Sequence, residues 1–154
     1  MQVSLPSGLY KIFTETPNGK LYAGVRADSS PDVAGGFPVI AGPESNAAVI
    51  ELQNIEGLKY NFLLWHHGGL SLGYKVNQFE QGSELIAVPE RQYGEWMLAY
   101  GRSSPERFRI ITPQSHLGWA VQEEAAGGAP IALRTPEPEG GEIVDWGFEF
   151  QGSA

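Results

Sequence analysis

The chain has 154 residues, which is enough for one domain with a sizeable core and short for two. It contains no cysteine, which excludes disulfides, thiolate zinc sites and thiol catalysis. Its net charge of −8 disfavours contact with phosphate backbones and anionic membranes, so neither nucleic acid nor a membrane is expected as a partner.

The predicted elements, taken along the chain, fall into three similar units at about residues 8–54, 58–101 and 106–151 of a single domain. The first strand of each unit has the pattern aromatic, polar, apolar, apolar. The first strands lie at residues 10–13, 60–63 and 108–111. The second strand of each unit carries a glycine followed by a large or β-branched residue, at Gly24-Val25, Gly73-Tyr74 and Gly118-Trp119.

The third strand of each unit is expected to end in Pro-Glu, at Pro43-Glu44, Pro89-Glu90 and Pro136-Glu137. The fourth strands are expected at residues 46–52, 95–100 and 145–150. The four landmarks therefore recur in the same order about every 47 residues. A repeat of this length is also typical of β-propeller blades, but three blades would not close into a ring. The repeats instead predict an all-β fold, a β-trefoil with twelve strands in three pseudo-symmetric four-strand units, whose closure removes open sheet edges.

Apolar residues alternate with polar ones along these strands, as half-buried strands require. The alternation places Tyr10, Ile12, Phe62 and Ile110 in the core. A second set of large side chains is expected to fill the base of the barrel, namely Trp96, Trp146 and Phe148. Burial of side chains of this size stabilises a fold by roughly 1.5–3 kcal/mol each.

Two motifs that could indicate catalysis are better interpreted as structure. The letters GLSLG at residues 69–73 match a hydrolase nucleophile elbow, but the elbow requires a strand-to-helix turn and no helix is predicted after them. The adjacent His66 and His67 would point to opposite faces of a strand, and His116 belongs to another unit, so no metal site is expected. No enzymatic activity, catalytic residue or cofactor is predicted.

The loops are the best candidates for function because binding residues concentrate in loops on rigid scaffolds. Loop 1 (residues 16–20) joins the first two strands, and loop 2 (residues 42–46) joins strands three and four. Proline restricts such loops before binding, so less entropy is lost when they enter another protein's cleft. The candidate contact residues are Thr16, Pro17, Asn18, Gly19 and Lys20 in loop 1, Gly42, Pro43, Glu44, Ser45 and Asn46 in loop 2, and His66 and His67 in the loop after strand five.

Several stretches of the chain carry a likeness to a known family: SGLYKI at residues 7–12, LYA at 21–23, PVIAGP at 38–43, FRIITP at 108–113, Leu117-Gly118 and DWGF at 145–148. Through these stretches the chain resembles the mycocypins, the clitocypin and macrocypin protease inhibitors of mushrooms, over nearly its whole length. The resemblance implies a β-trefoil in which loops 1 and 2 together occlude the cleft of papain-like cysteine proteases, with a second inhibitory loop at residues 66–69. A defensive role in the fungus is also implied.

Two alternatives stay open at this point. A related group of mushroom β-trefoils inhibits serine proteases, and a trypsin-like target would require a basic residue in a loop. The basic residues in or beside loops are Lys20, Arg26, Arg91 and Arg102, and Arg26 is the first choice because it stands at the start of the long loop at residues 27–36. The other alternative is a lectin, which exposed Trp residues at equivalent surface positions of two units would favour.

The start of the chain has neither a basic region nor a long apolar run, so no secretory signal is predicted. Together with the absence of cysteine, this predicts a cytoplasmic protein. A closed barrel with an acidic surface also favours a monomer.

Overall fold

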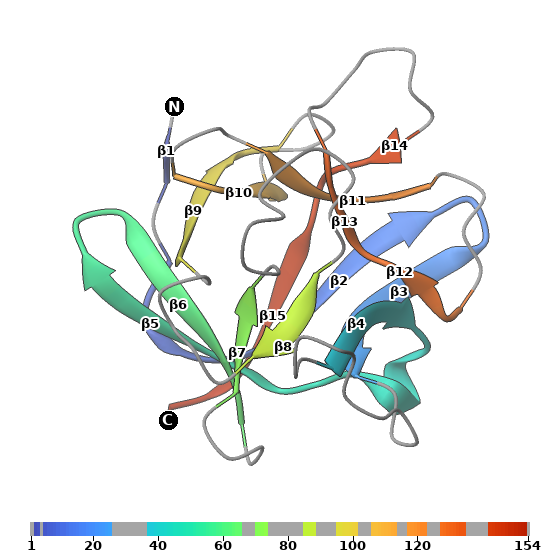
Figure 1. The fold of residues 1–154 in the computed structure, drawn as a ribbon, viewed down its shortest axis with the longest axis horizontal. Helices are drawn as coiled ribbons and strands as arrows, with labels where there is room; N and C mark the ends of the chain where they lie inside the picture. The colour runs from blue at the N-terminus through green and yellow to red at the C-terminus, as the bar shows by residue number, and fades with distance from the viewer. Residues whose placement is uncertain are drawn as a thin grey trace.

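The computed structural model describes residues 2–3, 5–25, 37–65, 70–73, 85–88, 95–101, 106–113, 117–122, 127–134 and 142–153. This part of the chain forms fifteen β-strands and one short 3₁₀ helix, η1 (Figure 1). The described residues include no helix with the length and apolar character needed to cross a membrane.

The strands are short, from two residues in β1 to nine in β2. Their bounds are β1 (Gln2–Val3), β2 (Gly8–Thr16), β3 (Gly19–Val25), β4 (Phe37–Gly42), β5 (Ile50–Glu56), β6 (Lys59–Leu64), β7 (Ser71–Gly73), β8 (Ile86–Val88), β9 (Glu95–Tyr100), β10 (Phe108–Ile111), β11 (Gly118–Gln122), β12 (Ala129–Pro130), β13 (Ala132–Arg134), β14 (Glu142–Ile143) and β15 (Gly147–Gly152).

Six of these strands close into a barrel. Antiparallel pairing runs from β15 to β2, and then through β5, β6, β9 and β10. The bridge between Phe108 and Trp146 joins the beginning of β10 to the residue before β15 and completes the circle. The barrel therefore has no free edge at this seam, as a stable all-β protein requires.

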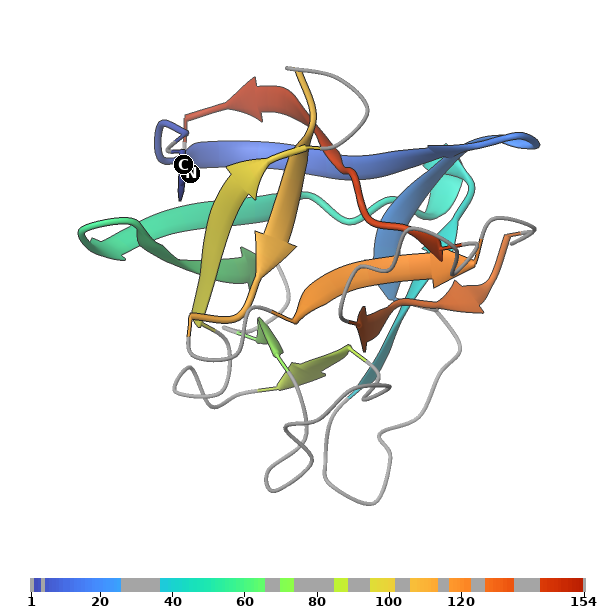
Figure 2. The same ribbon diagram turned by 90° about the horizontal axis from the view of Figure 1, so that it is seen from above.

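Three further pairs of strands cover one end of the barrel, namely β3 with β4, β7 with β8, and β11 with β13. Strand β1 pairs instead with β9 of the barrel, and β14 pairs with β11. Strand β4 also pairs with β8 and with β12, so the hairpins contact one another (Figure 2). A barrel of first and fourth strands, covered by hairpins of second and third strands, is the β-trefoil arrangement that the repeats predict.

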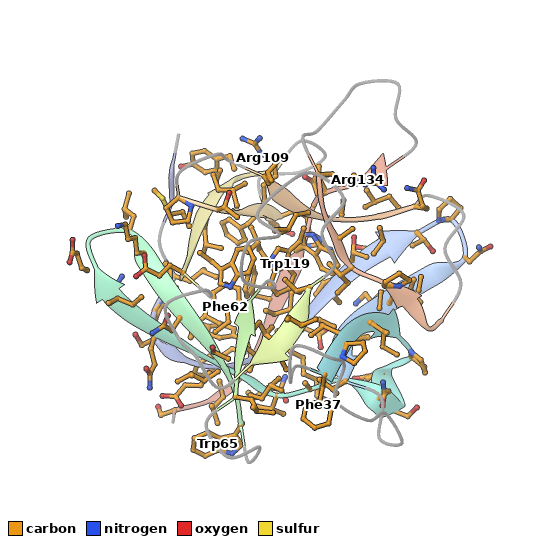
Figure 3. The ribbon with its side chains drawn as sticks, in the orientation of Figure 1. Phe37, Phe62, Trp65, Arg109, Trp119 and Arg134 are labelled. Atoms are coloured by element: carbon orange, nitrogen blue, oxygen red, sulfur yellow. The ribbon has the colours of Figure 1, made fainter. Side chains whose placement is uncertain are left out.

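Three tryptophans from two units meet in the centre of the core. Trp96, Trp119 and Trp146 are fully buried, and the Trp119 ring packs edge-on against Trp96 at 5.5 Å and Trp146 at 5.6 Å. The Phe62 ring lies 5.7 Å from Trp119, and both occupy the middle of the molecule (Figure 3). The predicted burial of Trp96 and Trp146 is confirmed, while Phe148 is only partly buried.

The predicted fourth strand of the first unit, residues 46–52, is wrong at its start. The C=O of Pro43 accepts a hydrogen bond from the Asn46 N–H at 2.9 Å, which closes a 3₁₀ turn where the strand was expected. Strand β5 begins at Ile50 instead and continues to Glu56. The predicted strand at residues 95–100 agrees with β9, and β15 begins two residues later than the predicted 145.

Ser71, the central residue of the GLSLG motif, is a buried residue of β7. It pairs with Leu63 of β6 inside the sheet. A nucleophile elbow would instead expose this serine at a strand-to-helix turn. The structural interpretation of the motif therefore agrees with the described part of the chain.

Candidate functional site

Loop 1 is a tight turn at the tip of the β2–β3 hairpin. The last pair of the ladder is Thr16 with Gly19. The Thr16 hydroxyl accepts a hydrogen bond from the Asn18 N–H at 3.0 Å and donates one to the Gly19 C=O at 3.0 Å. Gly19 has φ +117°, a conformation that glycine adopts without strain. Thr16 is buried, so the turn is fixed from below while Pro17, Asn18 and Gly19 stay exposed.

Loop 2 is a proline-initiated turn that contains η1 (Glu44–Asn46). Pro43 has φ −66° and stands before the turn, and the Ala47 N–H donates to the Glu44 C=O at 3.0 Å. Pro43, Glu44 and Ser45 are exposed, and Asn46 is half-buried. The exposed part of loop 2 is thus held in one conformation by backbone hydrogen bonds.

A glycine of β3 supports loop 2 from beneath. The backbone C=O of Asn46 comes so close to Gly24 that a Cβ atom built there would lie 2.2 Å from its oxygen. The Ala48 N–H donates to the Ala23 C=O at 3.1 Å beside this contact. Loop 2 therefore comes so close to β3 that no side chain would fit at position 24, which explains the glycine of the repeat there.

The third unit also supports loop 2. The Gly128 N–H donates to the Ala41 C=O at 2.8 Å at the end of β4. A Cβ atom built on Gly127 would lie 3.5 Å from Cδ of Pro43. Loop 2 therefore lies against the turn before β12 as well as against β3.

The two loops project from the same end of one sheet. Strand β3 leaves loop 1 and β4 leads into loop 2, and the two strands pair antiparallel with Tyr22 opposite Gly42. At roughly 3.4 Å per residue, the tip of loop 1 lies about 14 Å beyond this pair. Both views show the tip of the β2–β3 hairpin and the turn after β4 on the same side of the molecule (Figures 1 and 2). One partner surface could contact both loops at once.

Ion pairs on the outer face tie both loops to the barrel. Lys11 of β2 lies 3.8 Å from the Glu44 carboxylate in loop 2. Lys20 in loop 1 lies 3.6 Å from the Glu149 carboxylate of β15, and its ammonium is 4.5 Å from the centre of the Phe13 ring. The Lys20 side chain is thus directed back onto the barrel.

Arg107, a residue of the third unit, contacts the β2–β3 hairpin of the first unit. Its guanidinium forms a 2.5 Å ion pair with the Glu15 carboxylate and lies 4.9 Å from the centre of the Phe13 ring. The Phe13 ring is thus contacted by two cations, Arg107 and Lys20. The hydrogen bond from Arg107 lowers the pKa of Glu15 below its ordinary value.

Tyr22 connects β3 to the same carboxylate that pairs with Lys20. Its hydroxyl donates a 3.0 Å hydrogen bond to Oε2 of Glu149. Burial of the phenol, together with this hydrogen bond, raises the pKa of Tyr22 to about 12. The hydroxyl therefore stays protonated near neutral pH and remains a donor to Glu149.

Sequence reasoning placed some of these residues and missed others. The structure brings loops 1 and 2 together at one end, while Arg26, His66 and His67 lie outside the described residues, as do Arg91 and Arg102. The residues that position the hairpin, Arg107 and Glu149, were not predicted. Only the alternation along β2, which puts Phe13 and Glu15 on the outer face, could have pointed to them.

No family model and no curated protein matches this chain in sequence. Solved structures do match it in fold. A proteinase inhibitor from Coprinopsis cinerea superposes with a TM-score of 0.69 at 16% identity, over 96% of this chain and 100% of the inhibitor. The Macrolepiota procera ricin B-like lectin, solved in complex with lactose, gives 0.72 at 18% identity, over 97% and 100%. The designed three-fold symmetric protein ThreeFoil gives 0.73 at 17% identity, over 94% and 99%. At these identities the likeness establishes the fold alone, and the chain is a β-trefoil.

Proposed function

We propose that this protein is a protease inhibitor whose loops 1 and 2 enter the active-site cleft of a papain-like cysteine protease. The observation that carries the proposal is the position of the two loops, since β3 and β4 bring residues 16–20 and 42–46 to the same end of one sheet. Loop 1 extends about 14 Å beyond the Tyr22–Gly42 pair and loop 2 lies behind it against Gly24, so the two loops form one long surface that suits an elongated cleft.

The conformation of the loops also suits this role. Loop 1 is fixed by the Thr16 hydroxyl, loop 2 by the turn at Pro43, and both are tied to the barrel by ion pairs. A loop that is already ordered loses little conformational entropy on binding. The exposed tips are short and polar, with Asn18 in loop 1 and Ser45 in loop 2.

The pairing of Lys20 favours a cysteine protease over a trypsin-like one. Trypsin binds a basic side chain in a pocket that contains an acidic group. Lys20 would have to leave Glu149 and the Phe13 ring to enter such a pocket. A serine protease target would therefore have to use another basic residue, for which Arg26 remains the first choice from sequence.

The comparisons support an inhibitor and a lectin in general terms, because the Coprinopsis cinerea inhibitor and the Macrolepiota procera lectin share the fold. The tryptophans distinguish the two roles. A lectin with repeated stacking sites would expose Trp residues at equivalent positions of at least two units, whereas Trp96, Trp119 and Trp146 are buried and Trp65 alone is half-buried. This observation favours the inhibitor.

The test is the residual activity of papain and trypsin, measured side by side with increasing amounts of the protein. Papain should lose activity and trypsin should keep it. Asn18→Trp and Ser45→Trp place an indole where the protease must approach, and each should weaken papain inhibition at least about tenfold, or about 1.4 kcal/mol. The control is Leu58→Trp, because Leu58 is 36% exposed in the turn between β5 and β6. This hairpin extends away from the β2–β3 hairpin, on the opposite side of the molecule (Figure 1).

The outcomes separate the alternatives. If only trypsin loses activity, the target is a serine protease and Arg26→Ala is the next variant. If papain is inhibited equally by the wild type and by both loop variants, loops 1 and 2 are not the site. If neither protease is inhibited at high excess, the inhibitor proposal is wrong for these two classes.

A further inference from the structure

Asn18, at the tip of loop 1, is the one asparagine of the chain that a glycine follows. The sequence has five asparagines, and the residues after the other four are Ala47, Ile55, Phe62 and Gln78. An asparagine side chain can be attacked by the backbone nitrogen of the next residue, and glycine hinders this attack least because it has no Cβ. Asn18-Gly19 is therefore the pair in this sequence that is most open to such a reaction.

The structure leaves both reacting groups of the pair accessible. Asn18 and Gly19 are exposed at the tip of the β2–β3 hairpin, which projects from the body of the molecule (Figure 2). The Asn18 side-chain amide has no hydrogen-bond partner among the described residues. A Cβ atom built on Gly19 would meet nothing within 4 Å, so no neighbouring group blocks this glycine. The Asn18 side chain can thus turn toward the Gly19 nitrogen without losing a hydrogen bond to the described part of the chain.

The position of Gly19 in the hairpin also favours the reaction. Gly19 and Thr16 form the last pair of the β2–β3 ladder. The end of a hairpin opens locally more easily than its middle, because fewer contacts must be broken. The Gly19 nitrogen is therefore released for attack without unfolding of the barrel.

The β5–β6 hairpin provides a contrast within the same molecule. Asn54 is also exposed, but its side-chain amide donates to the C=O groups of Gly57 and Lys59, at 2.9 and 3.3 Å. The residue after it, Ile55, has a stiff β-branched side chain that hinders attack on its nitrogen. An asparagine at a hairpin tip is thus protected in one hairpin and unprotected in the other.

We propose that Asn18 is a site of spontaneous deamidation and that this modification inactivates loop 1 with time. The Gly19 backbone nitrogen attacks Cγ of Asn18, and a new N–Cγ bond forms. The side-chain nitrogen leaves as ammonia and takes the proton of the Gly19 N–H with it. Water then opens the cyclic succinimide at one of its two carbonyls and gives either aspartate or isoaspartate. Water is the only reactant besides the chain.

The products change loop 1 in charge and in backbone length. Both products replace a neutral amide by a carboxylate, in a chain whose net charge is already −8. Isoaspartate also adds a methylene to the backbone between positions 18 and 19. The Thr16 hydroxyl bonds the Asn18 N–H and the Gly19 C=O, which lie on either side of this point, both at 3.0 Å. A longer backbone moves these two groups apart, so the hydroxyl no longer bridges them and the tip loses its fixed conformation.

The consequence for activity rests on the proposed function. A protease cleft that accepts the ordered, neutral tip of loop 1 would meet a longer and charged one after deamidation. Inhibition should therefore decline as the protein ages, without the action of another enzyme. Attack requires a deprotonated Gly19 nitrogen, so the decline should be faster in mildly alkaline than in mildly acidic solution.

The experiment is incubation of the protein in mildly alkaline buffer, followed at successive times by tryptic digestion and mass spectrometry. Asn18 lies in the tryptic peptide 12–20, Asn46 and Asn54 lie in 27–59, and Asn61 lies in 60–75. Peptide 12–20 should gain the mass of an NH₂-to-OH exchange and become a substrate of protein isoaspartyl methyltransferase, while the other two stay unchanged. Its rate in the folded protein should be within about tenfold of that of the free peptide 12–20, which is a protection of at most about 1.4 kcal/mol.

Asn18→Gln is the matched variant, because glutamine keeps the amide but requires a larger ring for the same attack. Peptide 12–20 of this variant should stay unmodified. Papain inhibition, normalised to the starting value of each protein, should fall with the modified fraction in the wild type and stay constant in Asn18→Gln. Protein digested without incubation is the blank for modification during the digestion itself.

Two mass-spectrometric results would overturn the modification site. One is a rate in the folded protein more than about tenfold below that of the free peptide, which would show that the hairpin blocks the attack. The other is equal modification of peptide 27–59. Constant papain inhibition by protein that is modified at Asn18 would overturn the inactivation. Fresh protein that does not inhibit papain would overturn the proposed function together with this inactivation, and the mass measurement would still decide the modification itself.

Discussion

Arg107 forms an ion pair with Glu15, a residue 92 positions before it in the sequence, and its guanidinium lies 2.5 Å from the carboxylate. The same guanidinium lies over the Phe13 ring, 4.9 Å from its centre. Glu15 is the last exposed residue of β2 before loop 1, so the contact connects the third unit of the fold to the tip of the first hairpin. The direction of loop 1 is therefore set partly by a residue that lies far from it in sequence.

The pairing of Glu15 predicts a difference in stability that depends on pH. Because Arg107 lowers the pKa of Glu15, the pair stabilises the fold when Glu15 is ionised, and this contribution is lost as the pH falls through the lowered pKa. Glu15→Gln should lower the free energy of unfolding by up to about 1 kcal/mol at about pH 7, the usual range for an exposed pair. The difference from the wild type in urea unfolding should shrink as the pH is lowered through the acidic range in which Glu15 becomes protonated. A difference that does not change with pH would show that Glu15 acts through packing.

Tyr22 predicts the opposite dependence, at alkaline pH. Its pKa of about 12 lies above the ordinary value of 10, so its stabilising effect is present below pH 10 and is lost as the pH rises toward 12. Tyr22→Phe should cost about 1 kcal/mol near neutral pH, because Glu149 loses a hydrogen-bond donor. The check is urea unfolding of both proteins at neutral and alkaline pH. The gap between them should narrow as the pH rises, and a constant gap would contradict the prediction.

Position 24 tests the support of loop 2. Gly24→Ala places a Cβ 2.2 Å from the Asn46 oxygen, so the backbone of loop 2 must shift, and we expect a loss of about 1–3 kcal/mol. The matched control is Gly118→Ala at the corresponding position of the third unit. There the nearest atom would be 3.5 Å away, an ordinary contact, and the cost should stay below about 1 kcal/mol. Thermal unfolding compares the two variants, and equal losses would mean that Gly24 is required by its strand and not by loop 2.

The fold could be predicted from sequence because the repeat depends on local patterns. An aromatic residue followed by one polar and two apolar residues, or a glycine such as Gly24 or Gly118, occurs at the same place in each unit and is read without knowing any contact. The place of loop 1 and the start of loop 2 follow for the same reason, whereas the end of loop 2 was placed too early. The turn at Pro43 was missed because residues 47–49 are apolar enough to be taken for a strand. The roles of Arg107 and Glu149 were not predictable, since each contacts a strand from a distant part of the chain.

The buried tryptophans allow one further test of the core. Nε1 of Trp146 donates to the Trp119 C=O at 2.9 Å, whereas Nε1 of Trp119 is buried and has no hydrogen-bond partner among the described residues. Both indoles are fully buried, so replacing either by phenylalanine removes a similar volume and keeps an aromatic ring at the position. Trp119→Phe, however, also removes an unpaired buried donor, whereas Trp146→Phe leaves the Trp119 C=O without its indole donor. Trp119→Phe should therefore be less destabilising than Trp146→Phe by about 1 kcal/mol in urea unfolding. An equal or larger loss for Trp119→Phe would show that its Nε1–H is satisfied in solution, for instance by a buried water.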